Sequence, residues 1–227
     1  MSLYTLAGMI EMRQASFAPT TPKGHRTRKR ILDAARSVFA REGFVEAHMG
    51  DIADAAELSA GGLYRYFMSK EDVFAALVAD LVGELYEASG HTAHSFSTQP
   101  YDALLEANRG YFSVYYENRD LLRAFVEAVA VDARFREMWW SARRRHVMRF
   151  VRAARAVHGK RKVDGVDLET VVESMACMVE QSAYLWWANE DLLARRVSVE
   201  DAARVVTRAW YLAVFDGATE RSSATVS

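Results

Sequence analysis

Apolar side chains recur every three or four positions along most of the chain, which is the spacing of one face of an α-helix. The first such stripe predicts a helix from about residue 27 to residue 42, with Gly43 as its C-terminal stop. The apolar members of this stripe are Ile31, Ala34, Ala35, Val38 and Phe39.

Two much shorter apolar faces follow between residues 51 and 67. Their members are Ile52, Ala53, Ala56, Leu63 and Phe67. Helices this short are not stable alone in water, and the small alanines allow two helices to cross closely. We therefore interpret this segment as a helix-turn-helix, with Leu58 in the break, held against the preceding helix.

The rest of the chain also has helical periodicity. Ser69-x-x-Asp72 has the form of a capping box for a helix that reaches about residue 88, and a linker (89–100) follows. Five more helices are expected, at about 101–117, 120–130, 132–158, 167–190 and 198–215. We find no strand alternation or hairpin signal, so the sequence predicts an all-α fold of about nine helices.

The last two of these helices are apolar on almost every side. A helix without a polar face must be buried on both sides, and one chain of 227 residues has little left to cover two of them. The sequence therefore predicts a partner subunit that covers the last two helices of this chain.

Charge and composition narrow the classes of protein further. The net charge is −1, but residues 23–30 (KGHRTRKR) form a basic cluster just before the helix-turn-helix. Cys177 is the only cysteine, and neither an export signal nor a membrane-spanning run is recognisable. These features favour a cytoplasmic protein with no membrane partner.

The second short helix begins with glycine, which is unusual. Gly61 and Gly62 each cost about 1 kcal/mol in a helix interior, a cost that is understandable where the backbone must approach another molecule closely. The helix N-terminus favours phosphate, and Tyr64, Arg65 and Tyr66 offer hydroxyls and a guanidinium to phosphates or base edges. These features predict a surface that binds double-stranded DNA.

The ordered motifs TRKRILDAARSVFAREGF and DIADAA-LS-GGLYRYF-SKEDVF resemble the TetR family of bacterial transcriptional regulators over about residues 25–85. The resemblance implies a homodimer that binds a palindromic operator and releases it when a small molecule enters the C-terminal domain. We expect this homodimer to form through a four-helix interface made by the last two helices of each chain. The resemblance also implies a set of DNA-contacting residues, with Lys70 on the phosphate backbone. These residues are Thr27, His48, Met49, Ala60, Gly61, Gly62, Tyr64, Arg65, Tyr66 and Lys70.

Several positions depart from the family pattern. Glu57 stands where the turn often has glycine, which predicts a strained or shifted backbone at a cost of about 1 kcal/mol. Gly50, Ala60 and Gly62 replace residue types that are frequent at positions that contact bases or the backbone. We therefore expect DNA binding without the base preference of any particular relative.

The domain organisation expected from these patterns has four parts. An arm (1–24) precedes a DNA-binding domain (25–85) whose helix-turn-helix spans about 48–67. An effector-binding and dimerisation domain (86–218) and a disordered tail (219–227) follow.

Candidate effector-binding residues lie in the aromatic-rich C-terminal half. Asn108, Tyr111 and Tyr115 share one helical face, which Phe125, Trp139 and His146 would close. His146 is either a core histidine or a polar handle in this pocket, and Gln181 either contacts the effector or makes a dimer hydrogen bond. The remaining aromatic side chains are expected in the core or at the dimer contact.

Other polar patterns have simpler interpretations. The arginines of residues 142–162 form either a solvated face or a site for an anionic effector, and Arg123 with Glu127 is interpreted as a surface ion pair. His91-x-x-His94 lacks a nearby acidic or thiol ligand, so we expect no metal site.

These patterns predict a ligand-responsive repressor and not an enzyme, with no cofactor. Motifs for nucleophilic catalysis or for phosphate-binding loops are not recognisable in the sequence. The expected effector is a small apolar or aromatic molecule. The alternatives are an architectural DNA-binding factor without effector, and a helical small-molecule binder or enzyme whose head no longer reads DNA.

Overall fold

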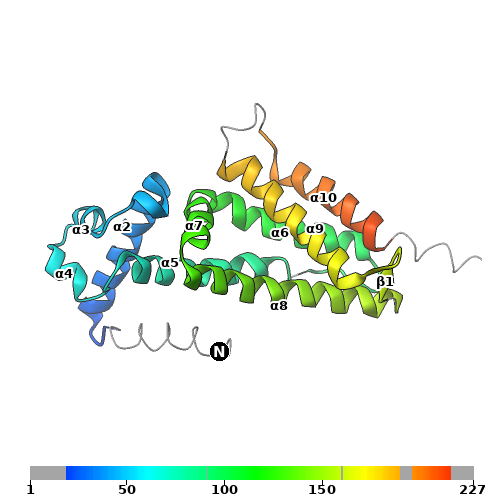
Figure 1. The fold of residues 1–227 in the computed structure, drawn as a ribbon, viewed down its shortest axis with the longest axis horizontal. Coiled ribbons are helices and arrows are strands. Elements are labelled where there is room, and N and C mark those ends of the chain that lie inside the picture. The colour runs from blue at the N-terminus through cyan, green and yellow to red at the C-terminus, as the bar shows by residue number, and fades with distance from the viewer. Residues whose placement is uncertain (1–18, 91, 160, 190–195, 216–227) are drawn as a thin grey trace, which may run out of the picture. The chain divides into compact units, whose positions relative to one another are not determined.

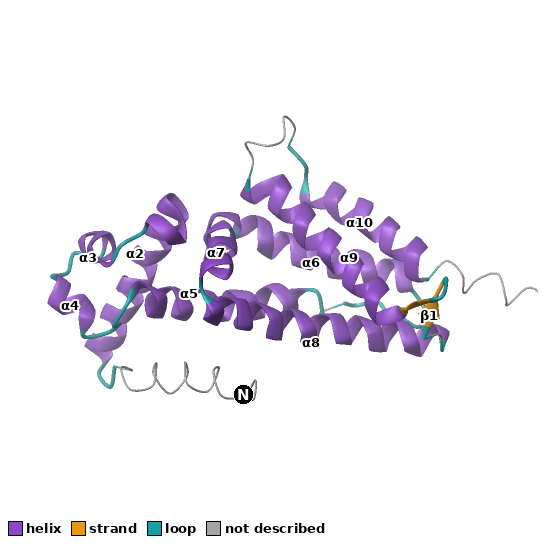
Figure 2. Cartoon of the chain, in the orientation of Figure 1, coloured by secondary structure: helices purple, strands orange, loops and turns teal. Residues whose placement is uncertain are grey.

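The computed structural model describes residues 19–90, 92–159, 161–189 and 196–215, and these ranges contain nine α-helices (Figures 1 and 2). The all-α prediction is confirmed. The predicted tail and residues 1–18 of the predicted arm lie outside the described residues. The helices are α2 (Pro22–Glu46), α3 (Met49–Ala55), α4 (Ala60–Tyr64), α5 (Lys70–Ala88), α6 (Pro100–Glu117), α7 (Arg119–Val131), α8 (Ala133–His158), α9 (Leu168–Ala183) and α10 (Val199–Val214).

Helix α2 is longer than its apolar stripe predicts. It begins at Pro22, where proline fits the first helical turn and the side chain of Thr21 caps the helix by accepting a hydrogen bond from the Gly24 amide (3.1 Å). The predicted arm therefore ends before residue 24. At the other end the backbone breaks at Gly43 (φ 78°), and a further helical turn continues to Glu46.

A small β-hairpin corrects the expectation that the chain lacks one. Strand β1 (Lys162–Val163) pairs antiparallel with β2 (Val166–Asp167). Asp164 (φ 50°) and Gly165 (φ 82°) form the turn between them. An Asp-Gly pair is suited to a two-residue hairpin turn, because both positions require a positive φ.

The penultimate helix changes character near its end. The sequence predicts one helix to about residue 190, whereas α9 ends at Ala183 and continues as a π-helical turn, η1 (Tyr184–Ala188). The indole of Trp187 in this turn donates a hydrogen bond to the carbonyl of Val197 (2.9 Å). This bond ties the end of the π-helical turn to the segment that leads into α10.

The chain divides into two compact units, which do not follow the linear division predicted from the sequence. The first contains the described residues up to Val82 together with Asp120–Trp140, and the second contains Gly83–Arg119 and the described residues from Ser141 onward. Helices α5 and α8 each contribute residues to both. None of the described helices combines the length and apolarity needed to cross a membrane.

Each unit has its own core. In the first, a cluster of phenylalanine rings joins α2, α5 and α8, with Phe74 lying 4.6 Å from Phe39 and 5.3 Å from Phe135 between ring centroids. In the second, α6 packs along α10, and α9 lies beside both (Figure 1). The first core supports the helix-turn-helix, and the second surrounds a small cavity.

Candidate DNA-binding surface and buried cavity

Helices α3 and α4 form the predicted helix-turn-helix. Ile52, Leu63 and Phe67 are buried beneath them, and the amide of Leu58 donates to the carbonyl of Ala53 (2.9 Å) to close the turn. The first turn of α3 is closed by the Asp51 carboxylate, which accepts from the His48 amide (2.9 Å). Two helices too short to be stable alone are therefore held by a shared apolar anchor.

The turn between these helices contains a strained residue. Glu57 has φ 53°, in the left-handed region where a side chain with a Cβ costs about 1–2 kcal/mol. Glu57 thus adopts the left-handed conformation that suits glycine, and this conformation strains the turn.

The tip of α4 has an open surface at Gly61. A Cβ built on Gly61 would meet no atom within 4 Å, so the interior of the protein does not require glycine there. A Cβ on Gly62 would lie 3.3 Å from the Ser59 hydroxyl, which caps α4 by accepting from the Gly62 amide (3.2 Å). The cap thus accounts for glycine at position 62, whereas no contact within the described residues accounts for glycine at position 61.

Four residues define what we call the reading surface: Ala60, Gly61, Tyr64 and Arg65. All four are exposed, and half of the Tyr64 side chain is open to solvent. By contrast, Met49, Gly62 and Tyr66 are only partly exposed. Four of the ten residues that the resemblance implies are thus exposed together on α4 and at its C-terminal cap.

The basic start of α2 lies against the same helix-turn-helix. The Arg28 guanidinium lies 5.2 Å from the centre of the Phe67 ring, which places Arg28 of α2 against the segment that follows α4. Thr27 donates its hydroxyl proton to the carbonyl of Lys23 (3.1 Å), so only its lone pairs remain for another molecule. The exposed basic side chains of this segment are Lys23, His25, Arg26, Lys29 and Arg30.

Lys70 differs from the predicted phosphate contact. Its ammonium group donates to the carbonyls of Phe44 (2.9 Å), Val45 (2.7 Å) and Ala47 (2.9 Å). A lysine has three N–H donors, and all three are used. Lys70 therefore caps the carbonyl end of α2 and has no donor left for DNA.

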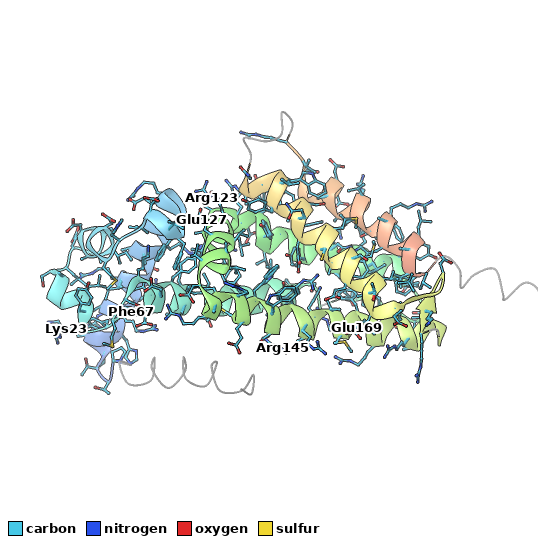
Figure 3. The ribbon with its side chains drawn as sticks, in the orientation of Figure 1. Lys23, Phe67, Arg123, Glu127, Arg145 and Glu169 are labelled. Atoms are coloured by element: carbon cyan, nitrogen blue, oxygen red, sulfur yellow. The ribbon has the colours of Figure 1, made fainter. Side chains whose placement is uncertain are left out.

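Helix α7 also binds the end of α2, at the Gly43 break (Figure 3). Glu127 accepts hydrogen bonds from the amides of Phe44 (2.8 Å) and Val45 (3.3 Å), and Arg123 donates to the carbonyl of Ala40 (2.7 Å). A Cβ on Gly43 would collide with the Glu127 carboxylate. The predicted surface pair between Arg123 and Glu127 is thus replaced by two separate contacts to the α2 backbone.

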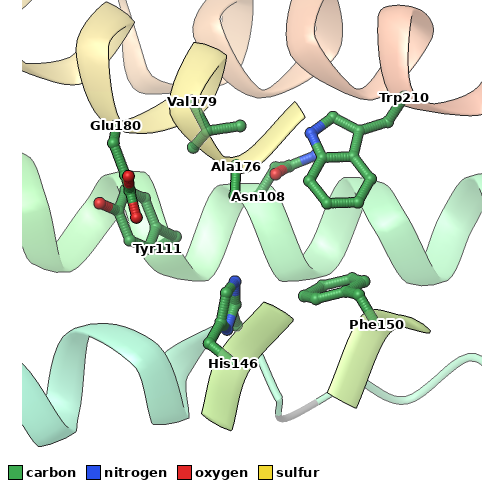
Figure 4. Close-up of a pocket in the computed structure, with 9 residues that line it drawn as sticks. Asn108, Tyr111, His146, Phe150, Ala176, Val179, Glu180 and Trp210 are labelled. Carbon is green, nitrogen blue, oxygen red and sulfur yellow. The ribbon is translucent and has the colours of Figure 1, made fainter. Parts of the chain in front are cut away.

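The second unit contains a small cavity (Figure 4). It has room for about one water molecule. Its lining comes from Ser89, just after α5, and from α6, α8, α9 and α10. The lining residues are Ser89, Asn108, Tyr111, His146, Phe150, Ala176, Val179, Glu180 and Trp210.

Three of the predicted effector residues line this cavity: Asn108, Tyr111 and His146. The buried Asn108 amide donates to the Thr207 hydroxyl (2.9 Å), which links α6 to α10. Burial raises the pKa of the Tyr111 hydroxyl well above its usual value, so this group stays protonated.

The other four predicted residues lie elsewhere. Tyr115 is buried with its ring 6.1 Å from that of Tyr111, and Gln181 is exposed on α9, so this amide does not need a partner inside the chain. Phe125 and Trp139 belong to the first unit. The polar side chain of α9 that lines the cavity is therefore Glu180, and not the predicted Gln181.

Glu180 belongs to a buried polar network that the sequence pattern did not indicate. Its carboxylate accepts from Arg143 (3.0 Å) and from the Tyr86 hydroxyl (3.0 Å), and the Arg143 side chain is almost fully buried. Burial raises the pKa of the Glu180 carboxyl, although Arg143 and Tyr86 oppose this shift. Arg143 lies in the basic cluster of α8, and the sequence alone does not distinguish it from Arg144 and Arg145. In the structure Arg143 is buried, whereas these two neighbours are exposed.

His146 projects from α8 into the cavity and is held from behind. Its Nδ1 lies 3.0 Å from Arg149 and 3.1 Å from the Ser89 hydroxyl. Burial, together with the charge of Arg149, lowers the pKa of His146 to about 3, so the ring is neutral near pH 7. His146 is thus both a partnered core histidine and part of the cavity wall.

The possible metal pair is only partly described. His91 lies outside the described residues, and His94 Nδ1 lies 2.9 Å from Glu106 Oε1. Across the described parts of the chain, no three His, Cys, Asp or Glu side chains are grouped so that they could hold a metal ion.

Residues 31–77 match the model of a family described as bacterial regulatory proteins, tetR family. This segment contains the α3–α4 unit, its turn and the residues that anchor it. The helix-turn-helix segment of this chain therefore matches the TetR family.

Curated transcriptional regulators of the HTH type match parts of the chain. The HTH-type transcriptional repressor KstR2 of Rhodococcus jostii (strain RHA1) is 32% identical over 125 residues, which cover 49% of this chain and 61% of the relative. The HTH-type transcriptional regulator UidR of Escherichia coli (strain K12) is 44% identical over 52 residues, 23% of this chain and 26% of the relative. The matched segments thus span less than two thirds of these relatives.

Solved structures of TetR-family regulators share the fold over most of the chain. The regulator PfmR from Thermus thermophilus has a TM-score of 0.62 at 20% identity, covering 79% of this chain and 96% of that chain. A regulator from Streptomyces coelicolor has a TM-score of 0.66 at 20% identity, covering 83% and 80%. At this identity the likeness establishes the TetR fold and leaves ligand and operator open.

Proposed function

We propose that this chain is a cytoplasmic, ligand-responsive repressor that binds a palindromic operator as a homodimer. The observation that carries the proposal is the open space at Gly61, at the centre of an exposed surface with Tyr64 and Arg65. Glycine at this position is costly for the helix and unnecessary for the core, but it permits close approach of a DNA backbone or base edge.

A substitution at Gly61 tests this proposal. Gly61→Ala adds one methyl group to open space and raises the helix propensity, so the protein should fold at least as well as the wild type. We expect it to weaken binding to the operator at least tenfold in a gel-shift titration. Gly83→Ala is the matched control, because a Cβ at this position in α5 also meets nothing within 4 Å.

The operator itself has to be found first, by sequencing genomic fragments that the purified protein retains. If Gly61→Ala and Gly83→Ala bind these fragments as tightly as the wild type does, the tip of α4 is not the DNA-binding surface.

The homodimer is proposed to form through α9 and α10. Val205 and Leu212 lie seven residues apart on one face of α10 and are 57% and 45% exposed, which is unusual for such apolar side chains. Cys177 and Gln181 are also exposed on α9. Light scattering should give the mass of a dimer for the wild type and of a monomer for Leu212→Glu, and a monomeric wild type would refute the dimer.

A dimer would present two reading surfaces to successive major grooves. The spacing required is about 34 Å or a multiple of it. An effector acts on such a dimer only if it binds one spacing more tightly than the other. The proposed place for the effector is the cavity of the second unit, which is buried and carries several polar groups on apolar walls.

An architectural DNA-binding factor without effector is the second candidate. The small size of the cavity favours it, because space for about one water molecule holds a ligand only if the cavity walls move apart. Thermal shift against a library of small apolar and aromatic compounds separates the two. A compound that stabilises the protein and releases it from the operator supports the repressor, whereas stabilisation by none supports the architectural factor.

A further inference from the structure

The cavity of the second unit contains a hydrogen-bond donor without a partner. The Trp210 side chain is 3% exposed, and its Nε1–H makes no hydrogen bond. Figure 4 shows the indole nitrogen on the side of the ring that faces Asn108. The Asn108 side chain donates its amide N–H to Thr207, and no hydrogen bond joins the Asn108 side chain to the indole. A buried donor left unpaired lowers stability, which makes it a candidate for binding an acceptor.

His146 supplies a second donor to the same cavity. The Arg149 guanidinium, 3.0 Å from His146 Nδ1, can only donate, so Nδ1 must carry a lone pair. This network assigns the proton of the neutral ring to Nε2. The ring projects from α8 toward α6 and α9, so that Nε2–H faces the cavity (Figure 4). The positive charge of Arg149 behind the ring makes Nε2–H a stronger donor.

The charges around the cavity disfavour an anion. The Glu180 carboxylate forms part of the wall and is held there by Arg143 and by the Tyr86 hydroxyl. Arg143 is already paired with this carboxylate, so an added anion would lie beside Glu180 without a free cation facing it. The remaining wall is apolar, with Phe150, Ala176 and Val179.

We propose that this cavity binds the carbonyl oxygen of an uncharged ligand with an apolar body, and that this oxygen accepts hydrogen bonds from Trp210 Nε1–H and His146 Nε2–H. The inference rests on the proposed effector response and names the chemical class of the effector. The space for about one water molecule fits a single oxygen atom. The apolar body enters where the rings of Phe150 and Trp210 meet, 5.1 Å apart between centroids, and separates them.

A matched pair of probes tests this proposal on the full-length protein. Acetophenone and α-methylstyrene have nearly the same shape, but only acetophenone has an acceptor oxygen. The five tryptophans give five indole N–H resonances in a proton–nitrogen spectrum, and Trp210→Phe identifies the one that belongs to Trp210. We expect acetophenone to shift this resonance downfield and to bind about 100-fold more tightly than α-methylstyrene, about tenfold for each of the two hydrogen bonds.

Two further measurements locate the second donor and the charge preference. His146→Phe should weaken acetophenone binding about tenfold and leave α-methylstyrene unchanged, whereas Trp139→Phe, in the other compact unit, should affect neither. Benzoate should bind more weakly than acetophenone because its charge lies beside Glu180.

Several outcomes would overturn the proposal. They are equal binding of the two uncharged probes, tighter binding of benzoate, and a Trp210 resonance that acetophenone does not move, as expected if the indole already bonds to the Asn108 side chain. All probe measurements are made without DNA. A failure of operator binding would therefore refute the proposed function and leave the carbonyl site standing, and the reverse also holds.

Discussion

The Glu127 carboxylate on α7 accepts a hydrogen bond from the backbone amide of Phe44 (2.8 Å), just past the point where α2 breaks at Gly43. This contact joins residues 83 positions apart in the chain. Together with the bond from Arg123 to the carbonyl of Ala40, it explains why α7 belongs to the same compact unit as the helix-turn-helix. The end of α2 is thus held by side chains that lie outside the DNA-binding motif.

Glu127→Ala should destabilise this unit. Hydrogen bonds to charged groups contribute about 1.5–3 kcal/mol each, so a loss of about 2 kcal/mol is expected in urea unfolding. Glu117→Ala, which removes an exposed carboxylate at the end of α6, should change stability by less than about 0.5 kcal/mol. Equal stability of the two variants would mean that the Glu127 contact contributes nothing.

Lys70 and Arg65 should respond differently to substitution. Lys70→Met leaves three backbone carbonyls without their donor, so it should lower stability by about 2 kcal/mol without changing the salt dependence of DNA binding. Arg65→Ala should have little effect on stability and should reduce the slope of log affinity against log salt by about one unit. If Lys70→Met also reduces this slope, Lys70 contacts a DNA phosphate as the sequence predicts.

Glu57→Gly should stabilise the helix-turn-helix. Glycine adopts a positive φ without the Cβ penalty, and we expect a gain of about 1 kcal/mol in the free energy of unfolding. Glu57→Ala keeps the Cβ and should remain within about 0.5 kcal/mol of the wild type. The same gain in both variants would show that the side-chain charge, and not the backbone strain, destabilises the turn.

Stability should fall in acid because of His146. Its pKa is lowered by burial to about 3, whereas the unfolded chain binds this proton near pH 6.5. As the pH falls from 6.5 toward 3, the unfolded state takes up a proton that the folded state refuses, and up to about 1.4 kcal/mol is lost per pH unit.

Glu180 acts in the opposite direction. Its raised pKa means that the folded state takes up a proton before the unfolded state does, so this group adds stability as the pH falls. Comparison with His146→Gln isolates the histidine. Between about pH 6.5 and 5.5, urea unfolding should show that the wild type loses about 1 kcal/mol more than the variant. Parallel profiles would contradict a buried neutral His146.

The sequence predicted the features that depend on local order along the chain. The apolar spacing from Ile31 to Phe67 and the glycine-led motif identified the helix-turn-helix and the TetR resemblance, since both are read from neighbouring residues. The Asp164-Gly165 hairpin carried an equally local signal, which the helical periodicity around it concealed.

Other features depend on contacts between distant segments. Lys70 has the sequence context of a phosphate contact, and only the folded chain places it beneath the end of α2. For the cavity, Gln181 and Glu180 are adjacent in a helix that looks apolar all round, and a small difference in register decides which of the two is buried. Trp210 gave no signal, because an unpaired indole N–H exists only in the packed structure.

The central claim is that two copies of the exposed tip of α4 read one DNA duplex, and selection from a random-sequence duplex library tests it most directly. The wild-type protein should enrich an inverted repeat whose half-sites lie about 10 base pairs apart between centres, or a multiple of that spacing. Arg65→Ala should relax the preference at symmetric positions in both half-sites. Enrichment of no repeat, or an unchanged preference after substitution of Arg65 and Tyr64, would contradict the account.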